Sequence, residues 1–195
     1  MVGLDLAGVP HRPTGVCVLS GLDARTALLY DDQEIIAFIL DKKADLVAID
    51  APLCLPPGRQ SIADRNSRHF RPCDEELRRR RIPFFPITLG PMRGLTERGM
   101  KLKRRFDAAG FCVIEIYPGG AQDVWGLPRA KVNLSGLRRG LTRLGLRGLK
   151  KDACGHELDA ATGALVGLLF LKGKGEVLGD FLSGAIVMPA VGRSL

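Results

Sequence analysis

The segment Leu46-Val47-Ala48-Ile49-Asp50 decides the fold of this 195-residue chain. Four consecutive apolar residues without polar alternation are typical of a strand that is buried on both faces, as in a parallel sheet. A helix is expected before it, because Asp31-Asp32 provides an N-cap and Ile35, Ile36 and Ile39 form an apolar stripe. A strand that follows a helix in this way is expected to lie parallel to an earlier strand, through a right-handed crossover.

Three shorter apolar runs precede that helix, over residues 2–7, 14–19 and 26–30, and turn residues separate them. This spacing predicts a three-stranded antiparallel meander. Farther along, a buried strand is expected over 111–117 and a last strand over 185–188. Helices are expected over 74–81, 96–109, 134–144 and 152–171. We therefore predict an α/β, RNase H-like fold with a mixed five-stranded sheet, in which three antiparallel strands are followed by parallel strands and helices flank the sheet.

An irregular, basic insertion is predicted over residues 53–95, after the fourth strand. It is expected to be irregular because Pro-Pro-Gly occupies 56–58 and further prolines stand at 72, 83, 86 and 91. A loop-rich segment of this length in a compact domain is more often functional than idle. The sequence has no internal repeat and no linker, so we expect a single domain over 1–195.

The composition favours a soluble, cytoplasmic protein. The chain is 46% hydrophobic, enough for a full core. Its first apolar run is short and carries Asp5, unlike a signal peptide, and no apolar stretch is long enough to span a membrane. The five cysteines are widely spaced without a Cys-x-x-Cys motif, which argues against disulfides and structural zinc.

The net charge of +8 is unevenly distributed. Residues 59–151 contain 22 Lys and Arg against 8 Asp and Glu, whereas the remainder has an acidic balance. A basic segment beside an acidic remainder suggests a surface that binds a polyanion, and a solvated surface without a partner is the alternative. Within this segment Arg71, Arg78 and Arg79 are the candidate substrate-binding residues. They would contact phosphates, unless Arg71 pairs internally with Asp74 or Glu75.

Four carboxylates are the candidate catalytic residues. Asp5, Asp50 and Glu115 stand within or at the end of apolar strand segments, and Asp159 lies in the last predicted helix. A carboxylate is rarely buried unless it is paired, hydrogen-bonded or bound to a metal. In the expected strand order the first three lie on neighbouring strands, and hard divalent cations take such oxygen ligands. The pattern predicts a two-metal phosphodiester-cleaving site in which all four hold Mg²⁺ or Mn²⁺.

Each residue also has a structural interpretation. Asp5 and Asp50 could be strand-end or turn residues, Glu115 could pair with a basic side chain, and Asp159 could lie on a helix surface. His156, on the same helix face as Asp159, is either an acid/base group or a histidine satisfied in the core. Asp152 on that face could be an outer residue of the site, but an N-cap is the simpler role.

The sequence resembles the domain of unknown function 429 family, which groups predicted nucleases with an RNase H-like fold. The matching segments run across nearly the whole chain. They are Gly3-Leu4-Asp5-Leu6-Ala7, Ile49-Asp50-Ala51-Pro52-Leu53, Arg71-Pro72-Cys73-Asp74-Glu75-Glu76-Leu77-Arg78, Glu115-Ile116-Tyr117-Pro118 and Glu157-Leu158-Asp159-Ala160-Ala161. The resemblance implies the same four acidic residues as the site. Holliday-junction resolvases share this architecture, which suggests structured DNA by analogy.

A metal-dependent nuclease acting on nucleic acid is the main hypothesis. A nucleotide-binding phosphotransferase or ATPase-like protein of the same fold superfamily is an alternative. However, a single glycine follows Asp5 closely, where such enzymes have a glycine-rich phosphate turn. A non-catalytic nucleic-acid-binding module is the other alternative, although four carboxylates would repel phosphate. The choice between DNA and RNA, and the oligomeric state, stay open.

Overall fold

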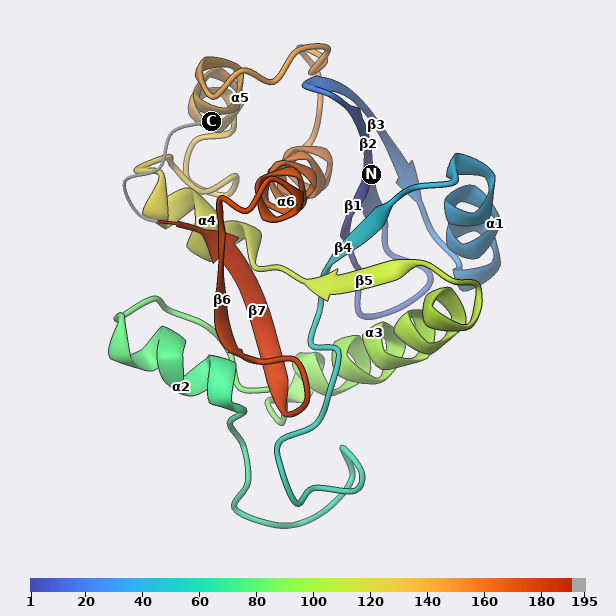
Figure 1. Ribbon diagram of the computed structural model, residues 1–195, viewed down its shortest axis with the longest axis vertical. Helices are drawn as coiled ribbons and strands as arrows, with labels where there is room; N and C mark the ends of the chain where they lie inside the picture. The colour runs from blue at the N-terminus through green and yellow to red at the C-terminus, as the bar shows by residue number, and fades with distance from the viewer. Residues whose placement is uncertain (191–195) are drawn as a thin grey trace.

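A five-stranded mixed sheet forms the centre of the computed structural model, which describes residues 1–190 (Figure 1). Its strands are β1 Val2–Asp5, β2 Thr14–Ser20, β3 Asp23–Leu29, β4 Leu46–Asp50 and β5 Cys112–Glu115. They lie in the order β3-β2-β1-β4-β5, with β2 antiparallel to both neighbours. β4 lies parallel to β1, and β5 parallel to β4. This arrangement confirms the predicted RNase H-like fold class.

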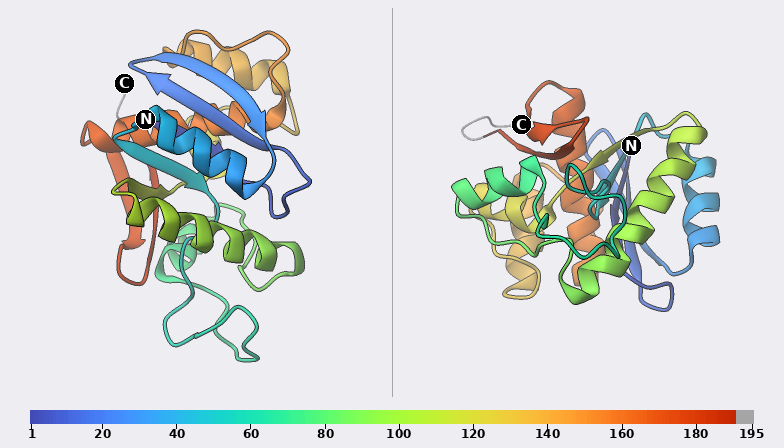
Figure 2. Two further views of the ribbon diagram at one scale, coloured as in Figure 1. Left: turned by 90° about the vertical axis from the view of Figure 1, so that its right-hand side faces the viewer. Right: turned by 90° about the horizontal axis from the view of Figure 1, so that it is seen from below.

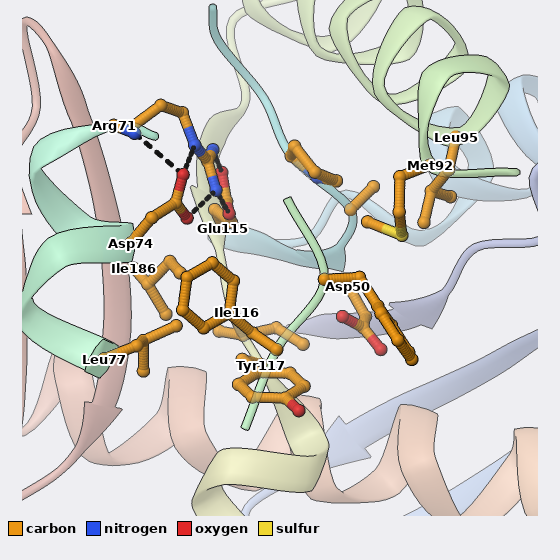
Figure 3. A pocket seen from close by; sticks show the side chains of 14 residues that line it. Asp50, Arg71, Asp74, Leu77, Met92, Leu95, Glu115, Ile116, Tyr117 and Ile186 are labelled. Atoms are coloured by element: carbon orange, nitrogen blue, oxygen red, sulfur yellow. Dashed lines mark hydrogen bonds and ion pairs between the residues drawn. The ribbon is translucent and has the colours of Figure 1, made fainter. Parts of the chain in front are cut away.

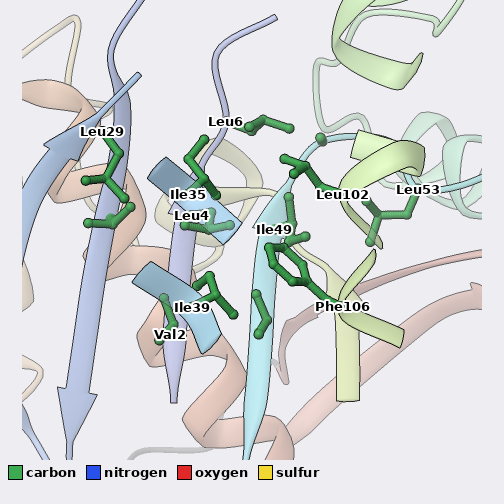
Figure 4. Packing of buried hydrophobic residues seen from close by; sticks show 13 residues of the cluster. Val2, Leu4, Leu6, Leu29, Ile35, Ile39, Ile49, Leu53, Leu102 and Phe106 are labelled. Carbon is green, nitrogen blue, oxygen red and sulfur yellow. The ribbon is translucent and has the colours of Figure 1, made fainter. Parts of the chain in front are cut away.

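Different helices cover the two faces of the sheet. Figure 2 shows α1 (Asp32–Lys42) and α3 (Gly90–Ala108) on one face and α6 (Gly155–Leu171) on the other. Successive residues of a strand point to opposite faces, so β1 and β4 send every second side chain to each layer. On the α1–α3 face, Leu4 and Ile49 pack against Ile35, Leu102 and Phe106 (Figure 4).

The α6 helix is apolar on nearly all sides because other elements surround it. It contacts the sheet, α4 (Pro118–Val124), α5 (Leu134–Arg143), β6 (Gly175–Asp180) and β7 (Gly184–Pro189). β6 and β7 form a separate antiparallel pair, and a bridge between Ile116 and Val187 joins this pair to the end of β5. The strand expected over 185–188 is therefore confirmed as part of β7. β6 was not predicted, because its sequence Gly-Glu-Val-Leu-Gly-Asp has only two apolar residues.

Two strand glycines let α6 lie unusually close to the sheet. A Cβ atom added to Gly3 would lie 2.3 Å from the carbonyl oxygen of Ala160, and one added to Gly15 would lie 2.0 Å from the carbonyl oxygen of His156. Both distances are far shorter than a van der Waals contact. Any other residue at these positions would push the first half of α6 away from β1 and β2.

The insertion after β4 begins with an irregular segment, residues 51–71, that a buried cation organises. Arg59 is 5% exposed, and its guanidinium donates to the backbone carbonyls of Ser61, Ile62, Asp64 and Arg68. The segment then enters α2 (Pro72–Arg79), which packs against β6 and β7.

Two predicted helix starts are corrected. α3 begins at Gly90, six residues before the expected start at residue 96, because Pro91 fits the first turn. α6 begins at Gly155 because Cys154 is its N-cap, and the Glu157 carboxylate accepts from the Cys154 amide at 2.9 Å. Asp152 therefore lies in an exposed turn before the helix and is not its cap. No helix within residues 1–190 is long and apolar enough to cross a membrane.

Candidate acidic site at the ends of β1 and β4

Asp5 and Asp50 are the last residues of two adjacent parallel strands and are paired in register. Register partners in a parallel pair point to the same face of the sheet. Asp50 lies on the α6 face because Ala48, two residues earlier, packs in the cluster that includes Val166 of α6. The charge of Asp5 is close enough to Asp50 to raise the pKa of Asp50. The sheet register thus brings two acidic groups together, as the sequence predicted.

The first turns of α6 bring two further groups to this position. Nδ1 of His156 lies 2.6 Å from Oδ2 of Asp5. The His156 side chain is 52% exposed, whereas that of Asp5 is only 16% exposed, so the interpretation of His156 as a core histidine is wrong. One turn on, Asp159 accepts a hydrogen bond of 2.6 Å from Nε2 of Gln122, which α4 contributes.

Burial and, after it, repulsion between carboxylates determine the electrostatics of this site. Burial raises the pKa of Asp50 well above its usual value, and the nearby Asp5 and Asp159 raise it further. Burial, together with the charge of Asp5, raises the pKa of Asp159 to about 6. The hydrogen bond to Asp5 raises the pKa of His156. Within residues 1–190, neither Asp50 nor Asp159 forms an ion pair with Lys or Arg. These two carboxylates therefore have no direct salt bridge, although the charges of His156 and Lys131 lower the pKa of Asp159 somewhat.

Glu115 does not join this cluster, and this corrects the prediction. It pairs in register with Ile49, the neighbour of Asp50, and thus faces the opposite side of the sheet. Its Oε2 and Oε1 accept from the Arg71 guanidinium at 2.7 and 2.8 Å, and Oε2 also accepts from the Leu53 amide at 2.9 Å. The ion pair that the sequence left as the structural alternative for Glu115 is the one that forms.

Arg71 is correspondingly unable to bind a phosphate. Its side chain is 2% exposed, and it also donates to both carboxylate oxygens of Asp74. We call Arg71, Asp74 and Glu115 the buried triad. Internal pairing with Asp74, which was the alternative to phosphate binding, is therefore what the structure contains.

The other two substrate-binding candidates lie on the surface of α2. Arg78 pairs with Glu75 at 2.9 Å and stacks over the ring of Phe70, and Arg79 pairs with Glu76 at 2.7 Å. Both side chains are more than half exposed. Exposed pairs of this kind are weak, so both arginines can exchange their partners for phosphate.

Two residues near the acidic site were not expected from sequence. Gln122 lies in the segment Ala121-Gln122-Asp123, which matches no functional motif. Its hydrogen bond to Asp159 depends on how α4 packs on α6. Lys131 lies close enough to His156 and Asp159 to affect the pKa of each. No sequence motif distinguishes either residue, because each is brought into place by tertiary packing alone.

The donor set fits a divalent cation in chemistry but is not a closed ligand cage. Among residues 1–190, no group of three or more His, Cys, Asp or Glu side chains is arranged so that it could hold a metal ion directly. The Asp5–His156 hydrogen bond uses an oxygen that a cation would need. Carboxylate oxygens and an imidazole nitrogen are nevertheless suitable ligands, and small side-chain rotations would free them.

A cavity of about 180 Å³ adjoins the acidic site. Figure 3 shows Asp50 and Tyr117 at one side of this cavity and the buried triad at the other. Phe84, Phe85 and Met92 complete much of the apolar wall. Asp50 thus borders both the acidic site and the cavity.

Comparisons with known proteins give structural likenesses only. No protein-family model matches the sequence, and no curated protein does. The chain is similar to the solved structure of T. thermophilus RuvC in complex with a Holliday junction substrate. The TM-score is 0.48 and the identity 16%, over 95% of this chain and 99% of that one. It is also similar to another Thermus thermophilus RuvC structure, with a TM-score of 0.43 and 18% identity over 89% and 97%.

Proposed function

We propose that this protein is a divalent-metal-dependent nuclease whose acidic site consists of Asp5, Asp50, Asp159 and His156. The observation that carries the proposal is the convergence of three carboxylates from β1, β4 and α6 on one face of the sheet, without a salt bridge to Lys or Arg among the described residues. Such a cluster is electrostatically costly, and binding of Mg²⁺ or Mn²⁺ would offset that cost.

The three aspartates would hold the cation, and Gln122 would orient Asp159 by its hydrogen bond. When bound, a divalent cation supplies Lewis-acid polarisation of a phosphodiester and a water of lowered pKa. When the His156 ring is protonated, its Nδ1–H donates to Asp5. The proton that the ring can release is then the one on Nε2. His156 is half exposed and has a raised pKa, so it would carry a proton toward the leaving oxygen.

Exposed cations support nucleic acid as the substrate. Lys131 is exposed, and its charge acts on His156 and Asp159 in the acidic site. Arg139 and Arg143 are also exposed, on α5. Positive side chains of this kind bind the phosphate backbone and fix its position, without reading its sequence. They take the place of Arg71, which is buried. The choice between DNA and RNA stays open, and the family resemblance stays a prediction.

The acidic cluster favours catalysis over a purely binding role. A non-catalytic module would gain affinity by losing Asp5, Asp50 and Asp159, because each repels the phosphate backbone. A glycine-rich phosphate loop, which the phosphotransferase alternative requires, does not follow β1 in the structure. Residues 6–13 contain only Gly8.

The decisive experiment incubates the purified protein with labelled single-stranded, duplex and branched DNA and RNA in Mg²⁺, Mn²⁺ or EDTA. We expect cleavage of at least one substrate with either metal and none with EDTA. Asp5→Asn and Asp50→Asn should each abolish it. Asp45→Asn is the matched control, because Asp45 is an exposed aspartate just before β4, at the end of the strand opposite to Asp50. Cleavage that persists in both site variants would contradict the proposal.

A further inference from the structure

We infer that the cavity beside Asp50 receives one unstacked nucleobase of the substrate, next to the phosphodiester that the acidic site would cut. This inference rests on the proposed nuclease function and adds to it how the strand is held. It also implies that the scissile region is single-stranded or locally opened, because a base inside a duplex cannot reach such a cavity.

The position of the cavity is the first argument. Asp50 lines it and also belongs to the acidic site, so the two spaces share a wall (Figure 3). Tyr117, the residue before α4, lines it as well. The Tyr117 hydroxyl donates to the carbonyl of Pro83 at 2.5 Å, which holds the segment with Phe84 and Phe85 over the cavity. A strand with its phosphate at Asp50 would therefore have a neighbouring base at the cavity mouth.

The chemistry of the wall is the second argument. Phe84, Phe85 and Tyr117 provide three aromatic rings, and Met92, Leu95 and Ile186 provide apolar surface. Phe85 is 68% exposed, although it is a large apolar side chain. Nucleobases stack on aromatic side chains whatever their identity, because each base has a π-face. An exposed phenylalanine beside a nuclease site is suited to that contact.

The polar groups of the wall exclude a phosphate as the occupant. The Arg71 guanidinium is fully used by Glu115 and Asp74, so it has no donor for an anion. The buried triad contains two carboxylates and one guanidinium and is net negative. A neutral, flat group fits this surface better than an anion. The triad offers no free donor, and Asp50 is committed to the acidic site, so the base would be held by stacking and shape, with little preference among the four bases.

The volume of the cavity is the third argument. At about 180 Å³ it is smaller than the roughly 300–1,000 Å³ of pockets that hold drug-sized ligands. It has room for a single ring system and not for a whole nucleotide with its phosphate.

The test replaces one nucleotide at a time by an abasic tetrahydrofuran residue around the cleaved bond of the best substrate. Affinity is measured in Ca²⁺, which supports binding without rapid cleavage, and the cleavage rate in Mg²⁺. We expect one position at which loss of the base weakens binding about tenfold, the size of one stacking contact. Phe85→Ala should weaken binding of the intact strand by a similar factor and leave binding of that abasic strand unchanged.

The matched control is Phe181→Ala. Phe181 is also an exposed phenylalanine, at 62%, but it lies in the turn between β6 and β7 and does not line this cavity. Its loss should leave both strands unaffected. If abasic substitution has no effect at any position, or if Phe85→Ala weakens intact and abasic strands equally, the base-binding inference is overturned. Metal-dependent cleavage by the wild type would then still support the nuclease proposal. A wild type that neither binds nor cleaves any nucleic acid would overturn both.

Discussion

Glu115 pairs in register with Ile49 across β4 and β5, and this pairing turns its carboxylate to the face of the sheet opposite to that of Asp50. The two acidic residues therefore have different partners, although the charge of Glu115 still contributes to the raised pKa of Asp50. Asp50 lies with Asp5 and Asp159, and His156 is the partner of Asp5, whereas Glu115 is paired with the buried Arg71. The first group suits the binding of a cation, and the second fixes α2 and the start of the insertion to β5.

The buried triad should contribute strongly to stability. Arg71→Ala leaves the carboxylates of Asp74 and Glu115 without their cation in a site where their side chains are 3% and 6% exposed, and breaking a buried pair in this way costs about 3–5 kcal/mol. Urea denaturation measures the loss. Arg78→Ala is the control, because its pair with Glu75 is exposed and should cost no more than about 1 kcal/mol. Equal, small losses in both variants would show that the triad is not structural.

Removal of a carboxylate from the acidic site should separate activity from stability. We expect Asp50→Asn to lose metal-dependent cleavage and to melt at a higher temperature than the wild type in EDTA, because one repelling charge is gone. Thermal melts with and without Mg²⁺ test this. Mg²⁺ should raise the melting temperature of the wild type and have little effect on the variant. A variant that melts lower than wild type in EDTA would argue for a structural role of Asp50.

The metal-free protein should lose stability as the pH rises toward neutrality. The pKa of Asp159 is about 6 in the folded protein, against 3.8 without its surroundings, so the folded state binds this proton more tightly. The stabilisation is complete below about pH 4 and is lost as the pH rises through about 6. Melting temperatures in EDTA from pH 4.5 to 7.5 should fall less steeply in Asp159→Asn. Parallel curves for the two proteins would refute the assigned shift.

His156 should matter more for catalysis than for folding. His156→Ala removes an exposed ring whose partner is Asp5, so we expect a melting temperature close to wild type. Cleavage should fall about 10- to 100-fold, a typical effect of groups that orient ligands or transfer a proton. Rates across pH provide the distinction: a proton-transfer role predicts that a limb of the profile disappears in the variant, and an unaltered profile would leave only an orienting role.

Lys131 should contact phosphate more directly than the α2 arginines. A lost phosphate contact lowers the slope of log affinity against log salt by about 0.9 for duplex DNA. Lys131→Ala should show this change, since this exposed side chain carries a charge that acts on Asp159 in the acidic site. Arg78→Ala and Arg79→Ala should show it only if the strand also crosses α2. Fluorescence polarisation across salt concentrations compares all three, and an unchanged slope for Lys131→Ala would exclude it from the interface.

The sheet could be predicted from sequence because its information is local. Leu46–Asp50 is a continuous apolar run after a helix, and Val2–Asp5 opens a clear meander, so the element order predicted the RNase H-like fold, and that fold places the strands of Asp5 and Asp50 side by side. The side to which Glu115 points could not be predicted, since a shift of one residue in register reverses the face of every side chain. The sequence does not determine that register within the short run Cys112–Glu115.

The contacts of Arg71 and Gln122 illustrate a second limit. Arg71 stands in a run of charged residues that reads as solvated surface, yet it is buried because Glu115, 44 positions away, pairs with it. Gln122 reaches Asp159 only through the packing of α4 on α6. Both contacts join elements distant in sequence, and neither leaves a periodic or compositional signal. The alternative that the sequence had offered for Arg71, internal pairing with Asp74 or Glu75, is correct for Asp74, and the pairing with Glu115 is the part that was not foreseen.

The hydrogen atom that serves as the side chain of Gly15 has a consequence for how this site can vary. The backbone of α6 at His156 rests directly on that position, with no clearance for even one methyl group. The spacing between the imidazole and Asp5 is thus governed by an atom that takes no part in the chemistry. Gly15→Ala would leave each acidic residue in place along the chain and still misalign them in space. Tolerance to mutation here should therefore be lowest at a residue without any functional group.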